Sequence, residues 1–256
     1  MEVDDGVATA TLDRPPANAL DYELYGELSL MLDELESDDD VRVVIFASAN
    51  ERIFMAGADL RDMESYDRRR GASARKVDTV HATFLRLQRF GKPTIGVLSG
   101  HALGGGCEFA LCLDFRFMSR GRARIGLPEA TLGFVPGGGG TQRLARLVGR
   151  AKATELLMLG RRLDADEAAH IGLVTEACED PAGTAVRASE LARELATRPP
   201  VALRLIKRAL NDGVDGDLPA GLAVEREAVI EALSTEDARE GPRAFVEKRS
   251  PKFKGR

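Results

Sequence analysis

The segment of residues 100–114 most constrains the fold, because it joins a predicted strand to a glycine-rich turn and then to an apolar helix. The strand is residues 94–98, the turn contains the three consecutive glycines 104–106, and the helical pattern begins at Cys107. Glycine lets a backbone pass close to another molecule and adopt positive φ angles. The first N–H groups of a helix lack partners inside it and carry the positive end of its dipole. We therefore predict that this turn presents N–H groups to an atom with partial negative charge.

Two acidic residues stand beside glycine-rich turns. Glu108 follows the first turn among apolar neighbours, where an ionised carboxylate is costly, so we expect a raised pKa. Glu129 follows Pro128 and precedes a second glycine-rich run, residues 137–140. Taken alone, Glu129 would be an ordinary loop acid. Together, two such acids and nearby backbone donors favour acid–base chemistry on a polarised carbonyl group.

Composition narrows the class of protein. A chain of 256 residues fits one large domain, or one domain with an appendage. The net charge of −5 argues against a general nucleic-acid binder. We expect no membrane partner, because no apolar run is long enough to cross a bilayer and the first residues are acidic, unlike a signal peptide. The three cysteines and three histidines form no metal-ligand pattern, which predicts no metal site and a reducing, cytoplasmic compartment.

The hydrophobic pattern predicts two parts. Residues 1–197 alternate strand-like runs with amphipathic helical runs, which predicts an α/β body that holds the site. Strand-like runs become rare after Val174, and Arg198-Pro199-Pro200 is predicted to open a helical segment, residues 198–256. A segment this short buries little surface alone, so we expect it to pack on the body or on another subunit. Two local predictions are a surface loop at residues 66–75 and a helix capped by Thr141.

Four motifs resemble the enoyl-CoA hydratase/isomerase (crotonase) family, in family order and over nearly the whole chain. They are residues 56–60 (Ala-Gly-Ala-Asp-Leu), 95–114, 128–144 and 245–249. The resemblance implies an α/β fold in which a crotonase-like spiral of repeated β-β-α turns is followed by a C-terminal helical trimerisation segment. It also implies a homo-oligomer, either a trimer or a dimer of trimers. The substrate would be an acyl-CoA thioester, with coenzyme A as part of the substrate and no separate cofactor.

The resemblance also assigns roles to single residues. The backbone N–H groups of Ala58 and Gly105 match the family's oxyanion hole. Glu108 and Glu129 match the two glutamates of the hydratases, and Gly137 matches the glycine that orients the water. The resemblance further implies a set of residues that bind coenzyme A, the last two supplied by a neighbouring subunit: Ala56, Asp59, Leu60, Phe245 and Lys248.

Some positions depart from the family pattern. Members of the family often carry a lysine shortly after the first Arg-Pro, whereas here Pro16 follows Arg14-Pro15, which puts that phosphate contact in question. The loop at residues 65–75 is longer than in many relatives. Met55, Met63 and Tyr66 are candidates to line the acyl pocket, although the sequence does not define the length of the acyl chain.

The presence of both glutamates favours hydration of a 2-trans-enoyl-CoA to a 3-hydroxyacyl-CoA, as in fatty-acid metabolism. Glu108 would be the base that activates water, and Glu129 the acid that protonates the α-carbon. Three alternatives remain: a Δ3,Δ2-enoyl-CoA isomerase, another acyl-CoA lyase of the family, and a non-catalytic binding or scaffold member. The retained glutamates and the acidic net charge argue against the last of these.

Overall fold

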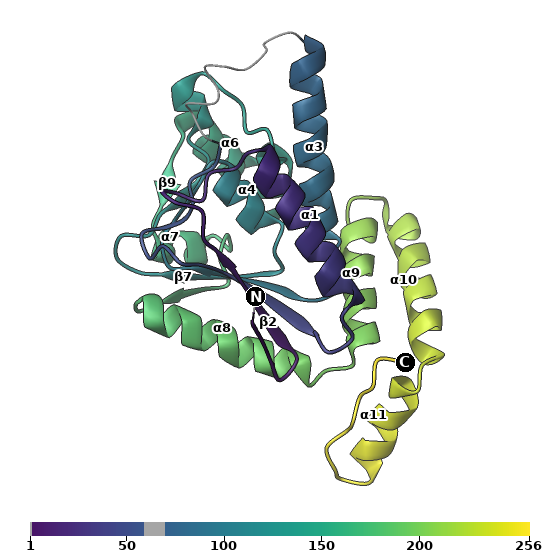
Figure 1. Ribbon diagram of the computed structural model, residues 1–256. Coiled ribbons are helices and arrows are strands. Elements are labelled where there is room, and N and C mark those ends of the chain that lie inside the picture. Colours follow the sequence, from purple (N-terminus) through teal and green to yellow (C-terminus); the bar gives the residue numbers. More distant parts are fainter. Residues whose placement is uncertain (1, 59–69) are drawn as a thin grey trace.

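The computed structural model describes residues 2–58 and 70–256, and it is built around two sheets (Figure 1). The larger sheet has the strand order β1-β2-β3-β5-β7-β10, and all of its pairs are parallel except β1–β2. Its strands are β1 (Glu2–Asp4), β2 (Val7–Leu12), β3 (Val43–Ser48), β5 (Thr94–Leu98), β7 (Phe115–Ser119) and β10 (Glu176–Cys178). The smaller sheet consists of β4 (Ile53–Met55), β6 (His101–Leu103), β8 (Ile125–Gly126) and β9 (Arg162–Leu163).

The chain repeats one pattern: a strand of the larger sheet, a strand of the smaller sheet, then a helix. The successive turns are β3-β4-α3, β5-β6-α4 and β7-β8-α5. The predicted spiral of β-β-α turns is therefore confirmed. The helices of the body are α1 (Tyr22–Ser37), α3 (Arg70–Gln88), α4 (Gly105–Leu111), α5 (Gly140–Val148), α6 (Arg150–Leu159), α7 (Ala165–His170) and α8 (Pro181–Ala196), with a short 3-10 helix, η1 (Glu129–Leu132).

The two faces of the larger sheet are covered by different helices, because side chains alternate along each strand. Val43 and Ile45 of β3 pack toward α8, in one cluster with its alanines Ala188 and Ala192. Phe46 belongs to the larger core cluster, where its ring meets that of Phe109 on α4 edge to face at 5.3 Å. The second face therefore anchors α4, the helix that begins with the glycine turn.

Three further helices follow the body: α9 (Pro200–Gly213), α10 (Leu218–Leu233) and α11 (Asp237–Val246). Helix α9 is fastened to the body by an ion pair of 2.7 Å between Lys207 and Asp114. Helix α10 lies beside α9, and α11 extends away from the body (Figure 1). These three helices expose many large apolar side chains: Ile206, Leu210, Leu218, Leu222, Val229, Ile230, Leu233, Phe245 and Val246. The boundary at residue 198, between the body and the C-terminal helical segment, remains a prediction.

Two local predictions were wrong. Thr141 does not cap α5, because the helix starts one residue earlier and its N-cap is Gly139, with a φ of +93°. Residues 70–75 form the start of α3 rather than a loop, and residues 66–69 of the predicted loop lie outside the described residues. Strands are rare after Val174, as predicted: the described residues there contain one, β10, with three residues at the edge of the sheet. In the described part of the chain, no helix combines the length and apolar character needed to cross a membrane.

Candidate active site

Two turns of small residues lie against each other at the end of the smaller sheet. The first follows β4 at Gly57-Ala58 and the second follows β6 at Gly104-Gly105. The Leu20 N–H donates to the Gly57 carbonyl at 2.7 Å and holds the first turn in place. Gly57 has a φ of +90°, and a β-carbon there would stand 2.9 Å from the Gly105 nitrogen. Only glycine fits this position.

The N–H groups of Ala58 and Gly105 are open to a ligand. Within residues 2–58 and 70–256, neither N–H donates a hydrogen bond. Both residues line a cavity of about 380 Å³. Its walls are largely apolar and include Leu20, Tyr25, Val77, Val80, Leu103, Leu132, Phe134 and Val135. Two N–H donors in such a cavity can stabilise negative charge on an oxygen atom more strongly than they could in water.

Glu108 lies in the first turn of α4, is 3% exposed and lines the same cavity. Its Oε1 accepts hydrogen bonds of 2.7 Å from the Gly138 and Gly140 N–H groups. Burial raises the pKa of this carboxyl group, and the two hydrogen bonds oppose that rise. The raised pKa predicted from the apolar neighbours is therefore confirmed.

Glu129 opens η1 on another wall of the cavity. Its Oε2 is buried and has no hydrogen-bond partner among the described residues. Burial raises the pKa of Glu129 to about 7, and the charge of Glu108 adds to the shift. A β-carbon on Gly104 would stand 3.3 Å from Glu129 Oε1, so this carboxyl group lies over the turn that presents Gly105. The fold thus brings both glutamates and both open N–H groups to one cavity.

The other predicted residues divide into three groups. Ala56 and Gly137 line the cavity. Asp59 and Leu60, like Met63 and Tyr66, fall outside the described residues. Phe245 and Lys248 stand at the end of α11, both exposed, and they are not among the residues that line the cavity of their own chain. Their assignment to a neighbouring subunit therefore stays a prediction.

The structure adds cavity residues that the sequence did not indicate. Lys76 on α3 and Arg162 on β9 both line the cavity and bring positive charge to it. The helical periodicity around Val77 and Val80 could have suggested Lys76, whereas only the pairing of β8 with β9 brings Arg162 there. Met55, by contrast, is fully buried in the core and does not line the cavity, because β4 turns its side chain inward.

This geometry agrees with the comparisons with known proteins. The family model described as enoyl-CoA hydratase/isomerase matches residues 2–256. The chain belongs to this family. The family resemblance predicted from the four motifs is thereby confirmed. The chain is an enzyme of the enoyl-CoA hydratase family.

Individual members of the enoyl-CoA hydratase family match over nearly their whole length. The short-chain-enoyl-CoA hydratase of Clostridium acetobutylicum is 41% identical over 254 residues, which cover 97% of this chain and 94% of that protein. The 2,3-dehydroadipyl-CoA hydratase of Escherichia coli is 41% identical over 251 residues, which cover 98% of this chain and 96% of that protein. The crystal structure of an enoyl-CoA hydratase from Bacillus anthracis has a TM-score of 0.91 at 38% identity, covering 98% of this chain and 96% of that one.

Proposed function

We propose that this enzyme adds water to a 2-trans-enoyl-CoA and forms a 3-hydroxyacyl-CoA. One observation carries the proposal: two carboxyl groups in different surroundings line the same cavity as two backbone N–H groups that donate no hydrogen bond to the described residues. Acid and base roles are commonly divided between groups whose surroundings push their pKa values apart. The open N–H pair supplies the place where negative charge develops.

The thioester carbonyl oxygen would accept hydrogen bonds from the N–H groups of Ala58 and Gly105. When water attacks the β-carbon, the electrons of the C=C bond move toward that carbonyl and form an enolate. The negative charge then rests on the oxygen, so these donors stabilise the transition state more than the substrate. The loss of one such donor typically lowers kcat by about 100- to 1,000-fold.

The two glutamates would move the protons. The hydrogen bonds from Gly138 and Gly140 favour the ionised form of Glu108, which suits a base that takes a proton from the attacking water. Glu129, with its pKa near 7, retains a proton that it can donate to the α-carbon. The N–H of Gly137 would orient the water. A C–O bond and a C–H bond form, Glu108 gains a proton and Glu129 loses one, and exchange with solvent restores both.

The coenzyme A end would be bound by Ala56, Asp59 and Leu60, with Phe245 and Lys248 supplied by a neighbouring subunit. The apolar side chains exposed on α9–α11 support assembly into a homotrimer or a dimer of trimers, because such surface is normally covered. The proposed reaction needs neither metal nor redox cofactor. We further propose that the enzyme is cytoplasmic.

The apolar cavity walls favour an aliphatic acyl chain. Because Lys76 and Arg162 bring positive charge to the same cavity, an acyl chain that ends in a carboxylate is a second substrate class for the assay.

The test follows the loss of the enoyl-thioester absorbance with crotonyl-CoA, and then with longer and carboxylate-ended substrates. Wild type should consume at least one of them. Glu108→Gln and Glu129→Gln should be folded and lose about 100-fold or more of kcat. Glu155→Gln is the matched control, because Glu155 forms a partly exposed ion pair with Lys152 on α6 and does not line the cavity.

Each alternative predicts another result. If wild type hydrates no enoyl-CoA but converts a 3-enoyl-CoA, it is an isomerase. If it binds acyl-CoA without turnover, it is a binding protein. Full hydration activity in either glutamine variant would remove that glutamate from the mechanism.

A further inference from the structure

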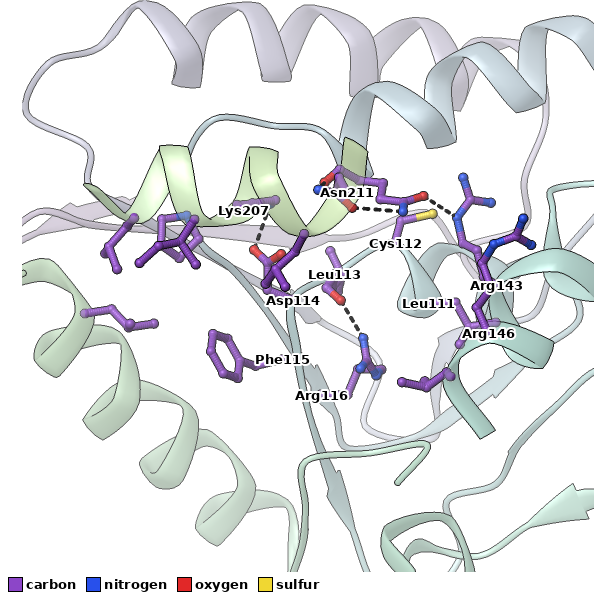
Figure 2. Close-up of a pocket in the computed structure, with 17 residues that line it drawn as sticks. Leu111, Cys112, Leu113, Asp114, Phe115, Arg116, Arg143, Arg146, Lys207 and Asn211 are labelled. Carbon is purple, nitrogen blue, oxygen red and sulfur yellow. Dashed lines mark hydrogen bonds and ion pairs between the residues drawn. The ribbon is translucent and has the colours of Figure 1, made fainter. Parts of the chain in front are cut away.

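A second cavity, of about 450 Å³, lies between α9 and the body, and a chain of hydrogen bonds runs along it (Figure 2). This series of hydrogen bonds begins at Asn211 on α9. The side-chain Nδ2 of Asn211 donates to the main-chain carbonyl of Gln88 at 3.1 Å, and its Oδ1 accepts from Gln88 Nε2 at 3.0 Å. Gln88 is the last residue of α3, and its Oε1 accepts from Arg143 Nε on α5 at 2.8 Å. Three helices far apart in sequence are thus joined through two amides and one guanidinium.

The chain of hydrogen bonds ends at the glycine run that holds Glu108. Arg143 Nη1 donates to the Gly138 carbonyl at 2.6 Å. The guanidinium lies directly over the next residue, because a β-carbon on Gly139 would stand 2.2 Å from Nη1. The N–H groups on either side of this peptide, those of Gly138 and Gly140, are the donors to Glu108 Oε1.

We propose that Arg143 is a positioning residue, which fixes the glycine run so that its N–H groups hold Glu108 in the orientation the reaction needs. The proposal rests on the hydration reaction proposed above, because it assumes that the orientation of Glu108 limits the rate. Arg143 does not line the catalytic cavity, so it would act on the reaction only through Glu108, by holding the loop and by its charge.

The glycine run needs such an anchor for a physical reason. Four consecutive glycines, residues 137–140, have no side chains to restrict their backbone, and ordering them costs more conformational entropy than ordering any other residue. A hydrogen bond from a charged donor is shorter and stronger than a neutral one. The planar guanidinium can also bond Gly138 and Gln88 in two fixed directions at once, which a lysine ammonium on its flexible stem does not reproduce.

The charge of Arg143 acts in the same direction as its hydrogen bonds. It lowers the pKa of Glu108 and so opposes the effect of burial. Among the other titratable groups, His81 also lowers the pKa of Glu108, and the charge of Glu108 in turn raises the pKa of Glu129. Loss of Arg143 should therefore both loosen Glu108 and raise its pKa.

The test compares four variants of the full chain: Arg143→Gln, Arg143→Lys, Asn211→Ala and Arg146→Gln. Arg146→Gln is the matched control. Arg146 stands one turn further along α5 and lines the same second cavity, but its Nε bonds Asp215 at 2.6 Å. Among the described residues it makes no hydrogen bond to the glycine run. Circular dichroism and gel filtration check that each variant keeps its fold and assembly.

We expect Arg143→Gln to lower kcat about 10- to 100-fold with a small change in KM, since a misplaced catalytic group costs rate more than binding. The acidic limb of its pH profile should move to higher pH, because Glu108 must be ionised to act as the base. Arg143→Lys should restore the acidic limb but only part of kcat. Asn211→Ala should show a weaker loss, and Arg146→Gln none.

Amide hydrogen exchange of Gly138 and Gly140 provides a readout that does not depend on activity. It should be faster in Arg143→Gln and unchanged in Arg146→Gln. Unchanged exchange in a folded Arg143→Gln would overturn the proposal, whatever reaction the enzyme catalyses. In an active hydratase, so would faster exchange with kcat and pH profile unchanged. If wild type hydrates no substrate, the proposed function fails, and the exchange rates alone then decide whether Arg143 holds the loop.

Discussion

Gly106 lies so close to Met55 that a β-carbon on the glycine would stand 2.0 Å from the Met55 carbonyl oxygen. The first turn of α4 therefore packs directly on the backbone of β4. Because Ala58 follows β4 and Gly105 opens α4, this contact sets the spacing of the two open N–H groups.

Gly106→Ala should be strongly destabilising. The atom in the way belongs to a backbone in the core rather than to a flexible side chain, so we expect a loss of about 3 kcal/mol or more in the free energy of unfolding. Gly26→Ala is the control, because Gly26 lies on the exposed side of α1 with no described atom within 4 Å of its β-carbon position. That variant should gain about 0.5–1 kcal/mol. Urea unfolding measures both, and equal stabilities would contradict the close contact.

Gly138→Ala should affect the rate more than the stability. A β-carbon there would stand 2.6 Å from Glu108 Oε2 and 2.8 Å from the ring of Phe84. The carboxyl group is the softer neighbour, so it should be displaced, and kcat should fall about 100-fold. Steady-state kinetics on the folded variant checks this, and a kcat within about twofold of wild type would show that Glu108 tolerates the shift.

The fall of kcat/KM at alkaline pH should reflect the deprotonation of Glu129. An acid must be protonated to donate, and the pKa of this group is raised to about 7, so activity should fall as the pH rises through that value. Stability should change in the same direction. The folded state binds the proton more tightly than the unfolded chain, so stability declines as the pH rises from the ordinary glutamate range toward 7 and is level above it.

Glu129→Gln provides the control for this pH dependence. Its residual activity should show no alkaline limb near 7, and its stability should exceed that of wild type most clearly above that pH. A limb that persists in the variant would have to come from another group. Denaturant unfolding at several pH values measures the stability change.

Lys207→Met should destabilise the junction of α9 with the body. Lys207 is buried, and Asp114 Oδ2 accepts from Lys207 Nζ at 2.7 Å and from the Thr94 N–H at 2.8 Å. Removal of one charge leaves the other poorly compensated, with an expected cost of about 3 kcal/mol, the low end of the range for buried ion pairs, because Asp114 is partly exposed. Lys152→Met, which breaks the more solvent-exposed pair with Glu155, should cost less than about 1 kcal/mol. Thermal unfolding compares the two, and similar losses would contradict the buried role.

The sequence predicts the centre of the site better than its surroundings. Glu108 and Gly105 carry local signals, because a glycine turn before an apolar helix and a carboxyl group among apolar residues are both visible in a short window. The alternation of strand-like and helical runs is visible in the same way, whereas the spiral of β-β-α turns was implied by the family resemblance. The motif resemblance, rather than any local pattern, assigned roles to Phe245 and Lys248, which one chain does not bring to its cavity.

Long-range contacts explain what the sequence did not predict. Arg143, Gln88 and Asn211 are ordinary polar residues of three amphipathic helices, and only the packing of those helices makes them one chain of hydrogen bonds. The start of α5 differs from the prediction for a local reason. A glycine with positive φ caps it, whereas the threonine that is the usual signal stands inside the helix.

The two peptide units that carry the open N–H groups of Ala58 and Gly105 also accept a hydrogen bond on their carbonyl oxygens. The Gly57 carbonyl, in the same peptide as the Ala58 N–H, accepts from Leu20, and the Gly104 carbonyl, in the same peptide as the Gly105 N–H, accepts from Glu108. A bond at one end of an amide draws electron density along it and makes the other end a better donor, by roughly 10–30% for each bond. The backbone N–H groups of Leu20, in the N-terminal segment, and of Glu108, in the first turn of α4, thus polarise the two donors before any substrate arrives.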